Sequence, residues 1–364
     1  MTDQNTLAAR PLALVTGGSN GIGLELAREL ARGGHDLLIV SENGAELDVA
    51  ARELRAEGAG VETCTADLAR EGGVASLLNA AQARPIEVLC VNAGVGLGGP
   101  FLDTELDREL SMIDLNVRGA VQLAKPVVRS MVERGAGRIL FTSSIAATMP
   151  DPFEAVYGGT KAFLRWFGEA LREELRDTGV TVTVLMPGVT ETNFFRRAGM
   201  LDTRAGTMKG DDPAVVAKQA VAGLMAGKDK VIPTVKNKVM ARVADMLPDV
   251  LAAKGHRSLS EPGSARKDEG GGLAVPIAAA AAAGVGLALF AGWKSRQDGR
   301  AVDREPVSPE AGFGAETRAE PEMRSDTDAQ AAPATVWVVQ EEVVVVDTPV
   351  AFAPERDRGD RLGR

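Results

Sequence analysis

Tyr157 and Lys161 stand four positions apart, and Tyr157 is the only tyrosine in the 364 residues. Residues four apart share one face of a helix, so the Lys161 ammonium is expected beside the phenol or beside a ligand that contacts both. A nearby positive charge favours the phenolate and lowers the pKa of a tyrosine from its usual value of about 10. The pair is a candidate general acid and base, although Y-x-x-x-K also arises by chance on amphipathic helices.

The elements that must position this pair follow a regular rhythm of short apolar runs and amphipathic stretches. Runs of Val, Ile and Leu without alternation are typical of strands buried on both faces of a sheet. Strand–helix repetition implies right-handed parallel crossovers, so we predict a doubly wound, Rossmann-type α/β sheet of about seven strands with helices on both faces. The predicted strands are 12–16, 36–40, 61–65, 86–92, 138–144, 180–186 and 230–233, and the predicted helices are 21–33, 43–57, 71–83, 104–133, 154–178 and 212–226.

Composition excludes several classes of protein. The net charge of −9 argues against a general affinity for nucleic acid or for anionic membrane surfaces. Cys64 and Cys90 lie in apolar runs, which indicates buried thiols in a reducing, cytoplasmic compartment. His35 and His256 are far apart in the sequence, so we predict no metal site, although carboxylate ligands leave a weaker option open. The N-terminus also lacks the pattern of a signal peptide.

A glycine-rich turn follows the first predicted strand and opens a helix. Glycines at 17, 21 and 23 permit close approach of the backbone to a pyrophosphate, and the helix N-terminus adds partial positive charge. A lone glycine run is often only a turn, but this position on the first strand of an alternating chain strengthens the dinucleotide interpretation. The predicted loop contacts are Gly17, Ser19, Asn20, Gly21, Ile22 and Gly23.

The spacing T-G-x-x-x-G-x-G resembles the nucleotide loop of the short-chain dehydrogenase/reductase family. The resemblance covers roughly residues 10–255, and we expect a catalytic domain over residues 1–258. Other family signatures follow in order: Asn92-Ala93-Gly94, Asn116 within LNVRG, Ser144, Tyr157 with Lys161, and Pro187-Gly188 with a threonine shortly after.

This resemblance implies an NAD(P)-dependent oxidoreductase that transfers hydride between nicotinamide and a carbonyl or secondary alcohol. Tyr157 would exchange the proton, while Lys161 would lower the pKa of the phenol and bind the nicotinamide ribose. Ser144, rather than its neighbour Ser143, would orient the substrate oxygen because it stands 13 residues before Tyr157. Asn116 would hold a water that links Lys161 to solvent.

The segment after the second predicted strand bears on the choice of dinucleotide. Glu42 stands where an acidic residue binds ribose hydroxyls, and its charge would repel a 2′-phosphate. We predict NAD, with NADP as the alternative, although Glu42 is equally well read as a solvated acid at a helix start. The resemblance assigns further cofactor contacts to Asp67, Leu68, Asn92, Ala93, Gly94, Tyr157, Lys161, Pro187, Gly188, and Thr190 or Thr192, of which Thr192 is preferred.

Residues 189–211 are predicted to form a lid over the substrate. Phe194, Phe195 and Met200 in this segment suggest an apolar wall, hence a small-molecule apolar ketone or alcohol as substrate. The alternative is a non-catalytic dinucleotide-binding sensor or scaffold that acts through the C-terminal tail. The complete set of four catalytic residues argues against it.

The C-terminal part changes in character after about residue 260. We predict a linker at 259–272, an apolar segment at 273–293, and an acidic, largely disordered tail at 294–364. The apolar segment has 21 residues without a charge, long enough for a transmembrane tether, although an alanine-rich packing helix or a linker is the alternative. Family relatives usually assemble through helices such as 104–133 and 154–178, which predicts a homodimer or homotetramer.

Overall fold

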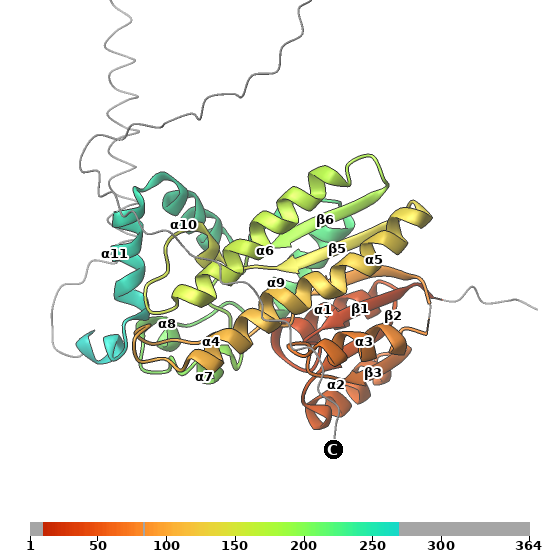
Figure 1. The fold of residues 1–364 in the computed structure, drawn as a ribbon, viewed down its shortest axis with the longest axis horizontal. Coiled ribbons are helices and arrows are strands. Elements are labelled where there is room, and N and C mark those ends of the chain that lie inside the picture. The colour runs from red at the N-terminus through yellow and green to blue at the C-terminus, as the bar shows by residue number, and fades with distance from the viewer. Residues whose placement is uncertain (1–9, 83, 269–364) are drawn as a thin grey trace, which may run out of the picture. The chain divides into compact units, whose positions relative to one another are not determined.

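Seven parallel strands form a single sheet in the order β3-β2-β1-β4-β5-β6-β7. The computed structural model describes residues 10–82 and 84–268 (Figure 1). The switch in strand order falls between β1 and β4, which is the crevice where doubly wound sheets bind ligands. The strands are β1 (Leu12–Thr16), β2 (Asp36–Ser41), β3 (Val61–Thr65), β4 (Ile86–Val91), β5 (Gly137–Thr142), β6 (Val180–Leu185) and β7 (Lys230–Val231).

Helices cover both faces of the sheet, as the buried strands require. Along β1, Ala13 and Val15 belong to one apolar core, and Leu12 and Leu14 belong to the other. The first core is closed by α1 (Gly21–Arg32), α2 (Gly44–Ala56) and α9 (Pro213–Met225). The second core is closed by α3 (Glu71–Ala80), α5 (Ala120–Arg134) and α6 (Ala155–Glu174). The predicted fold class is therefore confirmed.

The long helix predicted at 104–133 is divided. It consists of α4 (Leu106–Ile113), a π-helical turn (Asp114–Gly119) and α5. The Asn116 side chain lies in this turn, where it bonds the backbone of Val95. A β-carbon at Gly119 would lie only 2.4 Å from the Leu68 carbonyl oxygen, so the turn packs tightly. Single π-turns inside helices are frequent at functional sites.

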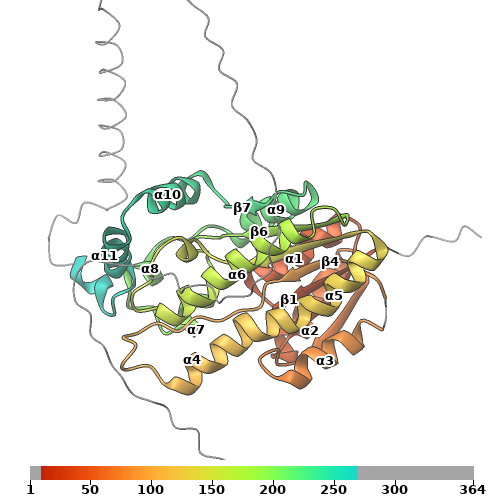
Figure 2. The same cartoon turned by 45° about the horizontal axis from the view of Figure 1, so that its top comes forward.

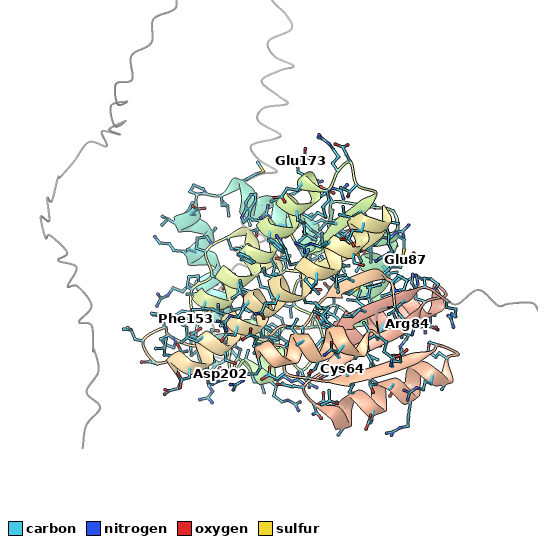
Figure 3. The ribbon with its side chains drawn as sticks, turned by 45° about the vertical axis from the view of Figure 1, so that its right-hand side comes forward. Cys64, Arg84, Glu87, Phe153, Glu173 and Asp202 are labelled. Carbon is cyan, nitrogen blue, oxygen red and sulfur yellow. The ribbon has the colours of Figure 1, made fainter. Side chains whose placement is uncertain are left out.

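Four helices outside the predicted set gather at one end of the sheet. They are α7 (Phe194–Arg197), α8 (Arg204–Thr207), α10 (Val235–Met246) and α11 (Asp249–Ser260). Both views place α8, α10 and α11 at this end (Figures 1 and 2). Figure 3 shows Phe153 and Asp202 there, with Arg84 and Glu87 toward the other end.

The described domain continues past the predicted boundary at 258. Ser260 ends α11, and a short 3₁₀ turn runs from Ser264 to Asp268. Within residues 10–82 and 84–268, no helix combines the length and apolarity that crossing a bilayer requires. The apolar segment 273–293 and the tail 294–364 lie outside the described residues.

Candidate active site

A cavity of about 960 Å³ lies at the carboxyl ends of the strands. That size suits a dinucleotide-binding or substrate-binding cleft. Its wall combines strand ends, the α1 loop, the 189–211 segment and parts of α10 and α11. The predicted residues on this wall are Gly17, Ser19, Asn20, Gly21, Ile22, Gly23, Glu42, Asp67, Leu68, Asn92, Ala93, Gly94, Ser144, Tyr157, Lys161, Pro187, Gly188, Thr190 and Thr192.

The glycine loop has the geometry that a pyrophosphate needs. Gly17 and Gly21 adopt left-handed backbone angles, with φ of 68° and 56°. A β-carbon at Gly23 would lie 2.0 Å from the Gly17 carbonyl oxygen, so any side chain there would break the turn. The first turn of α1 carries no acidic residue. Its N-terminal N–H groups therefore fit an anionic dinucleotide.

Three strand ends are joined by one polar network beneath the loop. The Thr16 hydroxyl oxygen accepts hydrogen bonds from the backbone N–H groups of Asn92 and Ala93, each over 2.8 Å. The Asn92 amide donates to the Thr16 carbonyl at 3.1 Å, and its oxygen accepts from the Thr142 hydroxyl at 3.1 Å. Asn92 therefore fixes the relative positions of β1, β4 and β5 under the cavity.

The region beside Glu42 contains an acid that the sequence did not reveal. Glu46 on α2 accepts a hydrogen bond from Asn20 at 2.7 Å and pairs with Arg197 at 3.3 Å. Arg197 comes from the lid segment and also lines the cavity. The Ser19 hydroxyl donates to Ser41 over 3.0 Å. A distance of 151 residues in sequence separates Glu46 from Arg197, so no local pattern could have paired them.

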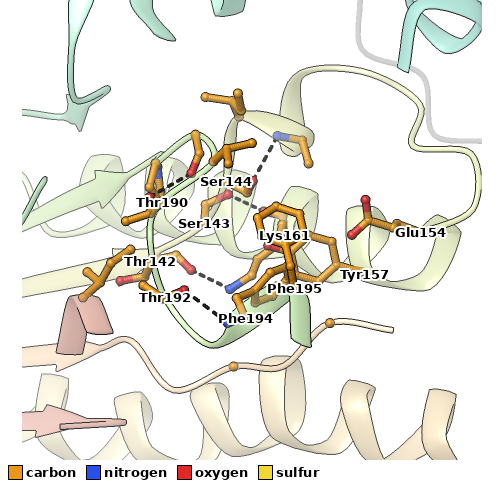
Figure 4. A pocket seen from close by; sticks show the side chains of 18 of the residues that line it. Thr142, Ser143, Ser144, Glu154, Tyr157, Lys161, Thr190, Thr192, Phe194 and Phe195 are labelled. Atoms are coloured by element: carbon orange, nitrogen blue, oxygen red, sulfur yellow. Dashed lines mark hydrogen bonds between the residues drawn. The ribbon is translucent and has the colours of Figure 1, made fainter. Parts of the chain in front are cut away.

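Tyr157 and Lys161 are both buried on α6 at the cavity (Figure 4). The Lys161 ammonium donates to the Thr142 carbonyl oxygen at 3.0 Å and lies 5.7 Å from the centre of the Tyr157 ring. Burial, with the charge of Glu154, raises the pKa of Tyr157, while a hydrogen bond with Ser144 acts in the opposite direction. Burial lowers the pKa of Lys161 to about 8. The pKa of Tyr157 is thus shifted opposite to the expected lowering, because burial and the charge of Glu154 outweigh the Ser144 hydrogen bond.

The two adjacent serines have different surroundings. Ser143 is almost fully buried, and its hydroxyl donates to the Lys161 carbonyl oxygen at 2.6 Å. The Ser144 oxygen accepts from the backbone of Ala146 at 3.1 Å, at the start of a 3₁₀ turn. Both serines are drawn in Figure 4, with Ser144 near Tyr157.

Asn116 lies behind the cavity wall rather than on it. Its side chain is fully buried and donates to the Val95 carbonyl at 2.9 Å and the Thr160 hydroxyl at 3.0 Å. A β-carbon at Gly94 would lie 3.1 Å from both the Asn116 oxygen and the Lys161 ammonium. The Asn116 oxygen and the Lys161 ammonium therefore both lie close to Gly94. The water that would link Lys161 to solvent stays a prediction.

The two candidate threonines both line the cavity with engaged hydroxyl groups. Thr190 donates to the Gly188 carbonyl at 2.9 Å, and Thr192 accepts from the Phe194 backbone at 3.2 Å. A β-carbon at Gly21 would lie 3.0 Å from the Thr192 methyl group. Thr192 therefore sits against the glycine loop.

The expected apolar wall is only partly formed by the predicted residues. The Phe194 ring lies 5.2 Å from the Tyr157 ring, and Phe195 packs edge-on against Phe194 at 5.4 Å. Met200 is buried instead. Its side chain packs against Gly98, where a β-carbon would lie 2.3 Å from Met200 Cγ. Further apolar wall residues come from α10, from α11 and from the link between them, which the sequence did not predict: Val239, Met240, Val243, Leu247 and Leu251.

A polar cluster beside Tyr157 was also missed. His256 Nδ1 lies 2.7 Å from Asp151 Oδ1, and the Ser260 hydroxyl donates to Glu154 at 3.0 Å. Burial raises the pKa of Asp151, and burial with the charge of Asp151 raises the pKa of Glu154 to about 7. Burial acts to lower the pKa of His256, but Asp151 raises it overall. The sequence held one signal for this cluster, namely the two acids Asp151 and Glu154 shortly before Tyr157.

The same cluster bears on the expectation of no metal. Asp151, Glu154 and His256 offer ligand atoms that lie within 4.8 Å of one another. This donor set could coordinate a divalent cation. The absence of a resident metal therefore stays a prediction.

The sequence and the fold both match known proteins. A family model described as short chain dehydrogenase matches residues 11–200. An uncharacterized short-chain type dehydrogenase/reductase of Sinorhizobium fredii is 38% identical over 188 residues, covering 51% of this chain and 73% of the relative. A 1-deoxy-11-beta-hydroxypentalenate dehydrogenase of Streptomyces exfoliatus is 33% identical over 258 residues, covering 69% and 90%. A solved short-chain dehydrogenase from Sphingobium yanoikuyae in complex with NADPH is 31% identical, with a TM-score of 0.59 and coverage of 65% and 92%.

Proposed function

Because the chain belongs to the short-chain dehydrogenase family and is an NAD(P)-dependent oxidoreductase acting on CH–OH groups, we propose that Tyr157 is its proton-transferring residue. The observation that carries this proposal is the convergence of Tyr157, Ser144 and Lys161 on one wall of a single cavity. No feature of residues 10–82 and 84–268 favours the alternative of a non-catalytic sensor or scaffold.

The proposed reaction divides the work among three side chains. When bound, the nicotinamide supplies the hydride chemistry. The buried Tyr157 phenol holds its proton at neutral pH, so it is suited to donate that proton to a carbonyl oxygen during reduction. The Ser144 hydroxyl is placed to hydrogen-bond the same oxygen and to stabilise charge that develops on it.

Lys161 supports this proton transfer from the next turn of the same helix. Its pKa of about 8 leaves the ammonium largely charged at neutral pH. One of its protons is used on the Thr142 carbonyl, which fixes the direction of the side chain. We propose that the remaining protons bind the nicotinamide ribose and that Asn116 positions a water behind Lys161.

For the cofactor we propose NAD, with NADP as the alternative. Glu42 lines the cavity and is exposed, so its charge would repel a 2′-phosphate. Arg197 approaches this region, but its guanidinium pairs with Glu46. NADP is the alternative because the similar dehydrogenase from Sphingobium yanoikuyae is in complex with NADPH.

The substrate we propose is an apolar ketone or secondary alcohol. Phe194, Phe195 and Met149 line the cavity near Tyr157, and α10 and α11 add aliphatic side chains. Such a wall favours burial of hydrocarbon at about 25 cal/mol for each Å² removed from water.

We also propose a homodimer or homotetramer built on the long helices. Leu106 and Leu110 on α4 are 65% and 48% exposed, and Trp166 on α6 is 61% exposed. Leu106 and Leu110, four positions apart, share one face of α4, and contiguous exposed apolar surface is typical of interfaces. Membrane attachment through 273–293 stays a proposal that fractionation of the full chain and of a chain lacking this segment would test.

The proposed function is tested with the full-length protein, NAD⁺ or NADP⁺, and a panel of apolar secondary alcohols. We expect turnover in the wild type and a loss of at least about a hundredfold in kcat for Tyr157→Phe. Cofactor affinity, measured by calorimetry, should change little in this variant. Turnover that survives Tyr157→Phe would exclude the proposed proton transfer.

A further inference from the structure

Glu154 is the residue that precedes α6, three positions before Tyr157, and its carboxyl group lies on the cavity wall beside the phenol (Figure 4). The residue is only 6% exposed. Oε2 accepts the hydrogen bond from Ser260, while Oε1 forms no hydrogen bond with any residue that the structure describes. One accessible carboxyl oxygen of a largely buried residue is thus left for whatever enters the cavity.

The surrounding contacts fix this carboxyl group in place. Asp151 and His256 form an ion pair next to it, with 2.7 Å between their nearest atoms. Between the two acids, Phe153 has a φ of 68°, which is strained for a residue with a side chain. The Gly99 backbone donates to the Phe153 carbonyl at 2.8 Å, and the Arg257 guanidinium lies 5.1 Å from the Phe153 ring. Glu154 is therefore preorganised rather than free to turn into solvent.

A hydrogen bond to a carboxyl group inside a largely apolar cavity is stronger than the same bond in water, so a ligand that supplies one gains affinity. We propose that Glu154 is a specificity-determining residue, which hydrogen-bonds a second hydroxyl group on an otherwise apolar substrate, away from the reacting carbon. This inference rests on the proposed function, because it names a further group of the substrate that the same cavity would bind.

A hydroxyl group suits Glu154 better than the other polar groups. The Ser260 hydroxyl already bonds Oε2 at 3.0 Å, so this carboxyl group accommodates a hydroxyl partner. A hydroxyl donates to the ionised carboxylate and accepts from the protonated one. An ammonium donates but cannot accept, and a ketone accepts but cannot donate, so each matches only one role of the carboxyl group.

The test compares methyl hexyl ketone with derivatives that carry one hydroxyl group on successive carbons of the hexyl chain. The measured quantity is the ratio of kcat/KM for each hydroxyketone to that of the parent ketone, with EDTA present. For the wild type we expect one position of the hydroxyl group to be preferred by about tenfold or more. The binding of the same ketones is measured by calorimetry.

Two substitutions at Glu154 and one control separate recognition from folding. Glu154→Leu should reduce the preference to a ratio near one, and Glu154→Gln should retain part of it because an amide still forms hydrogen bonds. The ratio does not depend on the folded fraction, so a purely structural loss would lower both rates and leave the ratio intact. Glu174→Leu, an exposed glutamate on the same helix, should keep the wild-type ratio.

The outcomes distinguish this inference from the proposed function. A preference that appears in binding without turnover would support the role of Glu154 and count against the oxidoreductase mechanism. A wild type without preference in either measurement would overturn the role of Glu154, and so would a preference that survives Glu154→Leu. A preference that appears only when EDTA is omitted would assign the cluster to a cation instead.

Discussion

The Ser143 hydroxyl donates a hydrogen bond to the backbone carbonyl oxygen of Lys161 over 2.6 Å, inside the protein. This contact fastens the end of β5 to the second turn of α6. It thereby holds the helix that carries Tyr157 against the strand that leads into Ser144. The two neighbouring serines have separate tasks, one in supporting the site and one in facing the cavity.

This division predicts different effects for two matched substitutions. Ser144→Ala should lower kcat/KM by about a hundredfold or more, because it removes a hydrogen bond to the developing charge. Ser143→Ala should lower the free energy of unfolding by about 1 kcal/mol, because a buried hydrogen bond is lost. Steady-state kinetics and urea unfolding of both variants check the pair. Equal kinetic losses in the two variants would contradict the assignment.

A second pair of substitutions tests the glycine loop. Gly23→Ala would bring a methyl group within 2.0 Å of the Gly17 carbonyl oxygen, so the loop must open and cofactor affinity should fall by at least about tenfold. Gly72, inside α3, has no described atom within 4 Å of the place where an alanine methyl group would lie, and its backbone is not left-handed. Gly72→Ala should therefore stabilise the protein by about 0.5–1 kcal/mol. Calorimetric titration with NAD⁺ and thermal unfolding measure both effects.

The sequence is most informative where local pattern and chemistry coincide. The strands are recognisable from apolar runs, and the glycine loop from its place after β1, because both signals lie within a few residues. The residues predicted to be catalytic, Ser144, Tyr157 and Lys161, also lie within one short stretch of sequence. These features depend little on long-range contacts.

The features that the sequence does not predict depend on contacts between distant segments. The cavity wall from α10 and α11 carries no motif, and its role arises from packing against the lid. Glu46 and Arg197 meet only after folding. The raised pKa of Tyr157 follows from burial and from Glu154, neither of which the Y-x-x-x-K pattern encodes.

Cofactor preference is predicted to depend on Glu42. Glu42→Arg replaces a charge that repels a 2′-phosphate with one that attracts it. We expect the ratio of kcat/KM for NADP⁺ to that for NAD⁺ to rise by at least about tenfold. Glu42→Gln, which removes the charge without adding one, should give a smaller rise. An unchanged ratio in Glu42→Arg would remove Glu42 from cofactor recognition.

The cluster of Asp151, Glu154 and His256 predicts how stability depends on pH. The pKa of Glu154 is raised to about 7, above its ordinary value of about 4.3 in an unfolded chain. Between these values the folded protein keeps a proton that the unfolded chain releases, so rising pH favours unfolding. The pKa values of Asp151 and His256 are also raised, which gives the same direction. The contribution of the cluster to the free energy of unfolding is complete at low pH and is lost as pH rises through about 7.

We therefore expect the free energy of unfolding to fall by roughly 2 kcal/mol from pH 5 to pH 8. Glu154→Gln cannot ionise and should flatten this slope, whereas Glu174→Gln, exposed on the same helix, should leave it unchanged. Urea unfolding followed by tryptophan fluorescence at several pH values provides the measurement. The burial of Lys161 acts in the opposite sense, but only above its pKa of about 8, where the unfolded chain still holds its proton. A slope that persists in Glu154→Gln would show that another group takes up the proton.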